Sequence, residues 1–334
     1  MKAAIYQGVG DVKVADLPDP KPGPKDVVVK IALCGICGTD TTEYHFSNSG
    51  AILPGKQFGH EYSGTVVDIG KDVKGISEGM RVTVNPMTAT RGGRRFACMV
   101  GGFAEYALVE DAAIDYNVYP LPDNLTLEDG ALVEPGSVGM HGVNTAEPKQ
   151  DDQVLILGAG PIGLGALAGM KALGIKNVIV SDISEFRLRK AKELGADAVH
   201  NPKVDDLAEF LEEMYPDQHA AMGYINATVD AAGAGSALED VICLSKSGAR
   251  ISIVALHKAS IDLEPMFFIM KDLQMKGSVG YPTEFPQVLG FFIDGKADLK
   301  PTITHRYPLS EIETALRTAI KANEAIKVMI DMSA

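Results

Sequence analysis

The stretch Val154-Leu155-Ile156-Leu157-Gly158-Ala159-Gly160-Pro161-Ile162-Gly163 decides the fold. Its apolar half predicts a buried strand, and an Ala/Gly/Leu-rich helix to about Leu173 follows the glycines. G-x-G-x-x-G in this context is typical of a turn that binds a dinucleotide on the helix N-terminus. Gly158 would allow the tight turn, Gly160 would let the backbone approach a pyrophosphate, and Gly163 would let helix and strand pack closely. A glycine-rich turn without nucleotide is the alternative.

Asp182 follows the next predicted strand, 19 residues after Gly163. An acid at this place would bind the adenosine ribose hydroxyls and repel a 2′-phosphate, which favours NAD over NADP. A plain strand-end acid is the alternative. Arg187 could stack on adenine or be a solvated helix charge, and the preference for NAD would weaken if it reached a 2′-phosphate.

Strands and helices alternate on the carboxyl side of this stretch, which predicts a parallel sheet covered on both faces. The predicted strands are 177–180, 198–199, 225–229 and 250–254, with a helix over 184–194. On the amino side, the first 110 residues carry short β-branched runs between turn residues, at 27–33, 64–70 and 81–84. They predict a small, mostly β, barrel-like domain, so the fold class is α/β.

The last 50 residues leave the doubly wound pattern and are expected to rejoin the first domain. They predict a strand over 302–307, a helix to about Lys321 and a final strand over 327–330. Ser310 and Glu313 match the S-x-x-E capping box of that helix. The expected domains are residues 1–140 together with 280–334, and residues 141–279.

Composition restricts the class of protein. The chain has 334 residues, a net charge of -13 and no run of about 18 apolar residues. The negative charge repels phosphate backbones and anionic membranes, so neither nucleic acid nor a membrane is expected as a partner. No secretory signal pattern opens the sequence, so we expect a cytoplasmic protein. Four cysteines in a chain of this length favour metal binding or burial over a disulfide framework.

Three metal-ligand residue types lie close together in the first domain. Cys34-Gly35-Ile36-Cys37 has C-x-x-C spacing, and His60-Glu61 begins 23 residues after Cys37. Thiolate, imidazole and carboxylate all bind zinc, and a catalytic zinc needs only three protein ligands. No second C-x-x-C follows, which excludes a four-cysteine ribbon. A buried thiol and a hydrogen-bonded core histidine are the alternative.

Taken together, these motifs resemble the medium-chain dehydrogenase/reductase superfamily, and most closely its zinc-dependent sorbitol and butanediol dehydrogenase branch. The segments that carry the resemblance are Gly35-Ile36-Cys37-Gly38-Thr39-Asp40, Gly59-His60-Glu61-Tyr62-Ser63-Gly64 with Val66 and Gly70, Ala131-Leu132-Val133-Glu134-Pro135, and Gly195-Ala196-Asp197. It covers essentially the whole chain and implies a GroES-like catalytic domain and a Rossmann domain.

The resemblance also implies roles for residues. Cys37 and His60 would bind one catalytic zinc with Glu61 or Glu134. Thr39 would hydrogen-bond the substrate hydroxyl, and Asp40 would orient a ligand. The backbone that meets the nicotinamide end of NAD would come from Val254, Ala255, Leu256, Val279, Gly280 and Tyr281. The implied reaction is hydride transfer between NAD and a secondary alcohol, diol or polyol, or the matching ketone, in a homodimer or homotetramer.

Three departures from the family pattern bear on these expectations. Only Cys98 stands between Asn85 and Gly102, so a structural zinc is not expected. Gly280 replaces an arginine that is common in the polyol branch, which weakens a sorbitol-like assignment. Thr42 stands where relatives carry a proton-relay histidine, so the proton would leave through water and a carboxylate, or through His45.

Other readings remain open. A zinc-free quinone or enone reductase of the same superfamily would not need Cys37, His60, Glu61 and Glu134 together. A non-catalytic NAD-binding protein would have kept only the fold. His141 and His305 are expected to be structural, and Tyr44 and Phe103 are expected to form an apolar wall of the substrate pocket.

Overall fold

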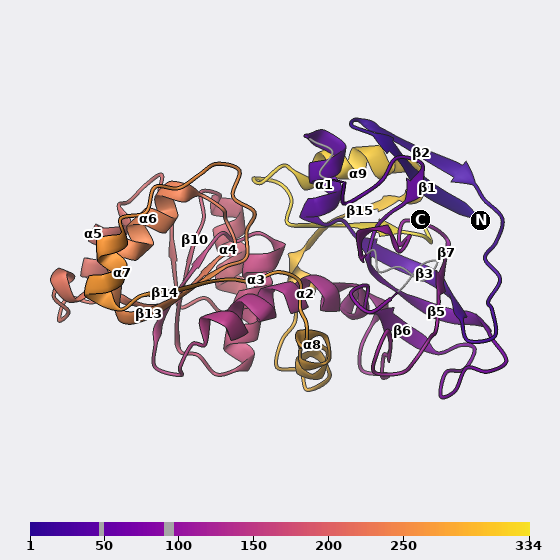
Figure 1. Cartoon of the computed structure of the whole chain (residues 1–334), viewed down its shortest axis with the longest axis horizontal. Coiled ribbons are helices and arrows are strands. Elements are labelled where there is room, and N and C mark those ends of the chain that lie inside the picture. Colours follow the sequence, from indigo (N-terminus) through magenta and orange to yellow (C-terminus); the bar gives the residue numbers. More distant parts are fainter. Residues whose placement is uncertain (47–49, 90–96) are drawn as a thin grey trace. The chain divides into compact units, whose positions relative to one another are not determined.

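A computed structural model describes residues 1–46, 50–89 and 97–334 (Figure 1). The chain divides into two compact units: unit 1 is Met1–Pro135 with Ile303–Ala334, and unit 2 is Gly136–Thr302. We expected the chain to leave the second domain at residue 280, but residues 280–302 belong to unit 2. The physical reason is that α8 (Glu284–Ile293) packs against α3 (Pro161–Ala172), and Glu284 binds His141 within the same unit.

Unit 2 contains a six-stranded sheet whose strands are all parallel, in the order β11-β10-β9-β12-β13-β14. The strands are β9 (Gln153–Leu157), β10 (Asn177–Ser181), β11 (Ala198–His200), β12 (Ile225–Asp230), β13 (Ser245–Ile253) and β14 (Gln274–Gly277). Every residue of β9 is buried, as its apolar run predicts. The strand order reverses between β9 and β12, which is where doubly wound sheets bind nucleotides.

Helices cover both faces of this sheet, as predicted. Figure 1 shows α3 and α4 (Glu185–Glu193) on one face, and α5 (Leu207–Met214), α6 (Gly235–Leu244) and α7 (Pro265–Lys271) on the other. Apolar side chains of α5 and α6, such as Leu211 and Leu238, pack with Leu155 and Ile179 in one buried cluster. Because helices cover both faces of the sheet, a ligand can reach it only at the ends of the strands, and in such sheets ligands bind at the carboxyl ends.

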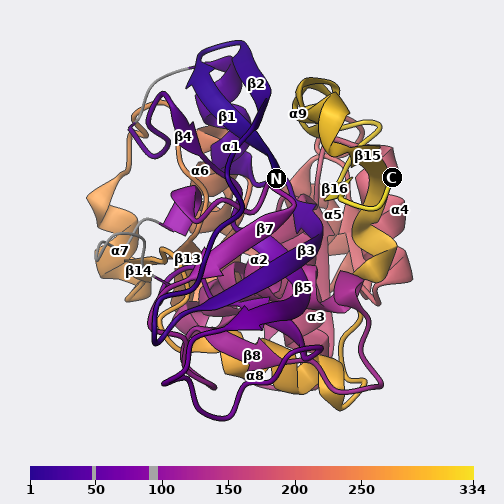
Figure 2. The ribbon, with the colours of Figure 1, turned by 90° about the vertical axis from the view of Figure 1, so that its right-hand side faces the viewer.

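Unit 1 is mostly β, with a sheet in the order β15-β16-β3-β5-β6-β8 and a smaller sheet in the order β2-β1-β4. Figure 2 shows β3 between β5 and β7, which both pair with it antiparallel. The strands are β1 (Lys2–Gly8), β2 (Asp11–Asp16), β3 (Val27–Gly35), β4 (Lys56–Gln57), β5 (Glu61–Ile69), β6 (Arg81–Val84), β7 (Tyr106–Val109), β8 (Val118–Pro120), β15 (Ile303–Pro308) and β16 (Lys327–Asp331). The helices of its amino-terminal part are α1 (Gly38–His45) and the first turns of α2 (Leu127–Ala146).

The C-terminal segment rejoins unit 1, as predicted, because β16 pairs antiparallel with the carboxyl end of β3. The predicted capping box is wrong. A 3-10 turn over Leu309–Glu311 precedes α9 (Ile312–Ala319), which has no side-chain cap. Glu313 instead accepts a hydrogen bond from the Val12 backbone N–H and pairs with Arg317. None of the described helices is long and apolar enough to cross a membrane.

Candidate metal centre and dinucleotide site

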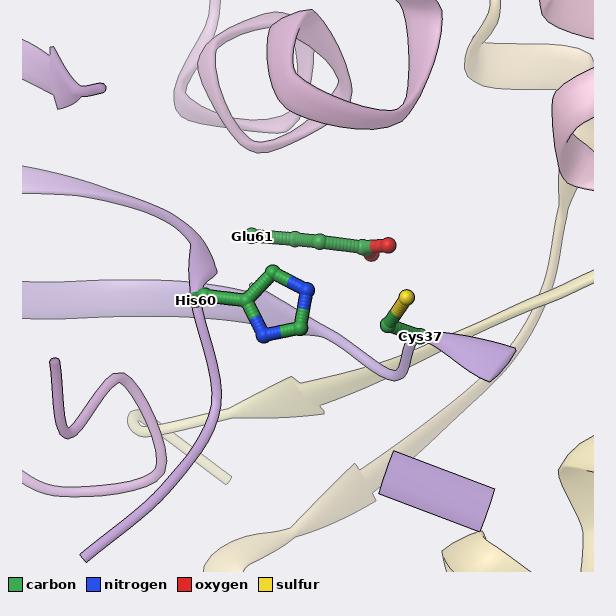
Figure 3. Close-up of side chains that lie close together, drawn as sticks. All are labelled: Cys37, His60 and Glu61. Atoms are coloured by element: carbon green, nitrogen blue, oxygen red, sulfur yellow. The ribbon is translucent and has the colours of Figure 1, made fainter. Parts of the chain in front are cut away.

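Within the described part of the chain, one group of three side chains has the spacing to hold a metal ion. One potential ligand atom from each of Cys37, His60 and Glu61 lies within 4.8 Å of the others. Figure 3 shows the Cys37 sulfur, the Glu61 carboxylate and the ring nitrogen of His60 remote from its Cβ, Nε2, directed to one region. The structure therefore brings Cys37 together with His60 and Glu61, which lie 23 and 24 positions further along the sequence.

Glycines make this arrangement possible. Gly59 precedes His60 with φ +88°, and a Cβ there would lie 2.7 Å from the Phe103 ring. Gly35 ends β3 beside Glu61, and a Cβ there would lie 2.1 Å from Glu61 Oε2. Both positions exclude larger residues, because one needs a left-handed backbone and the other needs room for the carboxylate.

Asp40 lies close to both Cys37 and His60. Cys37 is the residue before α1, and its backbone N–H donates to Asp40 Oδ2 at 2.9 Å. His60 Nδ1 lies 3.9 Å from Asp40 Oδ1. Burial raises the pKa of Asp40 to about 6, although His60 and the Cys37 N–H act to lower it. Asp40 thus fixes the backbone at Cys37, whereas its 3.9 Å separation from His60 Nδ1 is too long for a hydrogen bond, so its role in orienting a ligand stays a prediction.

His60 lies in a strongly negative environment. Burial lowers the pKa of His60. The net effect is nevertheless a pKa well above the usual value, because Cys37 raises it through its charge and a hydrogen bond, and the charges of Asp40 and Glu134 add to this. A site that stabilises positive charge in this way also favours a bound cation. Its sulfur, nitrogen and oxygen donors suit zinc, which takes such mixed sets with an open position in catalytic sites.

Glu61 has a partner that the sequence motifs did not reveal. Lys327, from β16, donates to Glu61 Oε1 at 2.8 Å and to Oε2 at 2.6 Å, and to the Ile36 carbonyl oxygen at 3.1 Å. Both side chains are about 1–2% exposed. Burial lowers the pKa of Lys327, but Glu61 and Cys37 raise it above its usual value. In the sequence, the only sign of a buried cation is that Lys327 stands at the start of an apolar strand.

Glu134 and Thr39 lie near the group without joining it. Glu134 is 7% exposed on α2 and raises the pKa of both His60 and Lys327 through its charge. Its carboxylate is not among the three ligand atoms that cluster within 4.8 Å. Thr39 Oγ1 lies 3.8 Å from Cys37 Sγ. The geometry of the described residues therefore favours Glu61 over Glu134 as the third member of the group.

Cys98 lies near the same charges but differs chemically from Cys37. Burial raises the pKa of the Cys98 thiol to about 11, with smaller effects of His60, Asp40 and Cys37. A thiol with such a pKa stays protonated at neutral pH and is a poor nucleophile. Residues 90–96 of the segment in which we expected no structural zinc lie outside the described residues.

Three residues near the motif pack into unit 1. His45 Nε2 lies 3.2 Å from the Leu316 carbonyl oxygen of α9. Tyr44 is 2% exposed, and its hydroxyl accepts a hydrogen bond from Arg317 at 2.8 Å. Phe103 is fully buried, and both rings belong to the hydrophobic core of unit 1. The prediction that Tyr44 and Phe103 line a substrate pocket is therefore wrong, because their rings pack against other core side chains.

Two further histidines have structural partners, as expected. His141 Nδ1 lies 2.9 Å from Glu284 Oε1 within unit 2. His305 Nδ1 lies 3.0 Å from Thr304 Oγ1, and its ring stacks on Tyr307. Neither belongs to the metal-binding group of the described residues.

The glycine turn of unit 2 has the properties that its motif predicts. Gly158 has φ +90°, and a Cβ at Gly163 would lie 1.8 Å from the Gly158 carbonyl oxygen. Gly160 precedes α3, whose first residues are Pro161 and Ile162. Among the described residues, a Cβ at Gly160 would meet only Arg187 Nη1, at 3.7 Å. The backbone at Gly160 is thus open to a phosphate, whereas Gly158 and Gly163 close the turn itself.

Asp182 and Arg187 flank this turn. Asp182 Oδ2 accepts the Ala159 N–H at 2.7 Å, and Oδ1 accepts the Ser184 N–H at 2.8 Å. A carboxylate has about four lone-pair sites, so both oxygens can still accept hydroxyl groups. Burial lowers the pKa of Arg187, while Asp182 raises it. Arg187 lies beside Gly160, the second glycine of the turn.

The segments assigned to the nicotinamide end follow β13 and β14. Leu256 and Val279 are 86% and 88% exposed. The other members are Val254, Ala255 and Gly280, which are half-buried, and Tyr281, which is 2% exposed and packs near Phe285.

The fold and this site define the class of protein: a zinc-binding, dinucleotide-dependent dehydrogenase. Residues 23–123 match the family model of the alcohol dehydrogenase GroES-like domain, and residues 161–294 match that of the zinc-binding dehydrogenases.

Curated relatives and solved structures agree. The chain is 32% identical to the sorbitol dehydrogenase of Bos taurus over 98% of this chain and 94% of that protein. It is 30% identical to the (R,R)-butanediol dehydrogenase of Bacillus subtilis (strain 168) over 99% of both. A putative zinc-binding dehydrogenase of Sinorhizobium meliloti 1021 bound to NADP has a TM-score of 0.88 at 28% identity, over 99% of this chain and 98% of that one. The chain belongs to the zinc-dependent alcohol dehydrogenase family of the medium-chain superfamily, in its sorbitol and butanediol dehydrogenase branch.

Proposed function

We propose that this protein transfers hydride between NAD and a secondary alcohol, diol or polyol, or the matching ketone. The observation that carries the proposal is the group formed by half-buried Cys37 with buried His60 and Glu61, in a chain that also has the glycine turn typical of dinucleotide binding. The relatives named sorbitol and butanediol dehydrogenase support a vicinal diol or polyol as the substrate class. A zinc-free reductase would have no use for this donor set.

The residues would divide the work as follows. Cys37, His60 and Glu61 would hold one zinc ion, which would supply Lewis-acid chemistry at the substrate oxygen. Thr39, beside the Cys37 sulfur, donates or accepts the hydrogen bond to the substrate hydroxyl. Glu134, buried near His60, takes the hydroxyl proton and passes it to water. NAD bound in unit 2 would supply the nicotinamide that accepts or donates the hydride.

The proton route follows from where the side chains lie. Thr42 can pass a hydrogen bond but cannot hold a proton near neutral pH. The His45 ring nitrogen Nε2 is held at the Leu316 carbonyl oxygen of α9, which ties that ring to a neighbouring helix. Glu134 is a buried carboxylate that acts electrostatically on His60, which supports it as the acceptor of the proton.

NAD is proposed as the preferred cofactor because the Asp182 carboxylate is fixed beside the glycine turn. Its negative charge would repel a 2′-phosphate. The Sinorhizobium meliloti relative is bound to NADP, and comparing kcat/KM for NAD and NADP tests the preference in this chain.

We propose a homodimer or homotetramer in the cytoplasm. Two features of unit 2 support self-association. Within the described sheet, β14 is an edge strand, and α7 exposes Met266, Ile269 and Met270. Light scattering after size-exclusion chromatography would measure the mass, and a monomer would contradict this proposal.

The function is tested by a screen of NAD reduction over diols, polyols, sugar acids and simple secondary alcohols, together with elemental analysis. We expect one zinc per chain and activity that a Cys37→Ala variant loses. Two zincs per chain, or full activity in Cys37→Ala, would contradict the metal assignment. Enone reduction without zinc would indicate the zinc-free reductase, and bound zinc and NAD without turnover would indicate a non-catalytic protein.

A further inference from the structure

Asp230 is a fully buried carboxylate at the carboxyl end of β12. In the sheet register it lies between Leu157 of β9 and Ile253 of β13. The glycine turn begins directly after β9, and the strand order reverses between β9 and β12. Open parallel sheets bind their ligands outside the carboxyl ends of the strands at such a point. A buried charge here stands beside the expected dinucleotide.

Asp230 joins the loop after β12 to the loop after β13. Its Oδ1 accepts the backbone N–H groups of Ala232 and Gly233, both at 3.0 Å. Its backbone carbonyl oxygen accepts those of Val254 and Ala255 at 2.9 and 3.0 Å. A buried carboxylate needs such donors, so these bonds stabilise the charge and fix both loops.

His257 completes this arrangement from the loop after β13. Its Nε2 lies 2.6 Å from Asp230 Oδ2, and its side chain is 14% exposed. The loops also contact one another, since a Cβ at Gly233 would lie 3.2 Å from the Leu256 carbonyl oxygen. A Cβ at Gly158 would lie 3.1 Å from the backbone of Ala231. The glycine turn and the two loops thus form one packed surface at the carboxyl edge of the sheet.

We propose that His257, held by Asp230, is a positioning residue for the dinucleotide. The imidazole N–H ties the loop after β13 to the buried carboxylate, so that the backbone of this loop is ordered before the cofactor arrives. Without this hydrogen bond, the dinucleotide has to order the loop when it binds. The entropic cost of ordering the loop then lowers the affinity for the dinucleotide. This inference rests on the proposed function, because it requires that unit 2 binds NAD or NADP.

The test compares His257→Leu with His257→Gln in the full-length, zinc-loaded protein. Leucine removes the donor, whereas the glutamine amide can place an N–H near the position of Nε2. We expect His257→Leu to raise the Kd for NADH, measured by fluorescence titration, about tenfold, or about 1.4 kcal/mol. We expect His257→Gln to stay within about threefold of the wild type. The KM for NAD should rise with Kd while kcat changes less, because the residue does not contact the reacting atoms.

Arg250→Leu is the matched control. Arg250 pairs with Asp152 beside the amino end of β9, in the same unit but away from the carboxyl edge. Its loss should lower stability without changing the NADH affinity. Equal NADH affinity in wild type and His257→Leu would overturn the inference alone, as would an equal loss of affinity in Arg250→Leu or no rescue by glutamine. A wild type that binds neither NADH nor NADPH would overturn the proposed function as well.

Discussion

Replacing Lys327 by methionine should destabilise the metal-free protein far more than the zinc-loaded one. Lys327 donates to both oxygens of Glu61, at 2.6 and 2.8 Å, in surroundings that are almost fully buried. Methionine keeps much of the side-chain volume but removes the cation. The Glu61 carboxylate would then be buried without a counter-charge, and breaking a buried pair in this way costs about 3–5 kcal/mol.

Zinc changes this balance because it brings its own positive charge to the same carboxylate. In the zinc-loaded protein the remaining loss is the hydrogen bond to the Ile36 carbonyl oxygen, worth about 1 kcal/mol. The difference between the two states, about 2–4 kcal/mol, must appear as tighter zinc binding through linkage. It corresponds to a zinc Kd that falls by at least about thirtyfold.

Urea unfolding with a chelator and with zinc measures the two losses, and chelator competition measures the Kd. Lys296→Met is the matched control, because Lys296 pairs with Asp294 where both side chains are 54% exposed, and such pairs contribute about 1 kcal/mol or less. The double variant Glu61→Gln with Lys327→Met should recover most of the metal-free stability. Equal losses with and without zinc would refute the reasoning.

Three further predictions concern the cofactor, the proton and pH. NAD should be preferred over NADP by at least about tenfold in kcat/KM, and equal efficiencies would contradict the role of Asp182. Glu134→Gln should lower kcat about a hundredfold while His45→Ala costs little, and an equal loss in His45→Ala would make that histidine the relay. Burial raises the pKa of Glu284, but hydrogen bonds from His141 and other donors lower it more, to a value below the usual one. The stability that Glu284 contributes is therefore complete above about pH 4.3 and lost as pH falls through its lower folded pKa, so Glu284→Gln should flatten acid unfolding curves in that range.

Local sequence chemistry predicted the glycine turn well. Gly158 and Gly163 are five residues apart, so a local motif is enough to predict both the left-handed backbone at Gly158 and the close contact between the two glycines. The same holds for Cys37 and Asp40, which lie on either side of a helix start. The predicted capping box failed because Glu313 found a tertiary partner, the Val12 N–H, that a local pattern cannot anticipate.

Long-range contacts account for the other differences. Lys327 is 266 residues from Glu61, and only folding shows that β16 carries it to the metal-binding group. The sequence likewise placed the return of the chain at residue 280, because it contains no local sign that α8 packs within unit 2. Asp230 and His257 were missed for the same reason, since an acid at a strand end and a histidine in a loop are ordinary by themselves.

The discontinuity of unit 1 has a consequence for the order of events during synthesis. Chains generally fold from the N-terminus as they leave the ribosome. Here unit 1 cannot complete its structure until the C-terminal segment has been synthesised, because β3 pairs with β16 and Glu61 pairs with Lys327. Unit 2 is continuous from Gly136 to Thr302 and is complete before the strands that close unit 1 have emerged. During that interval Cys37, His60 and Glu61 are already synthesised, but Lys327, the buried cation that pairs with Glu61, is not.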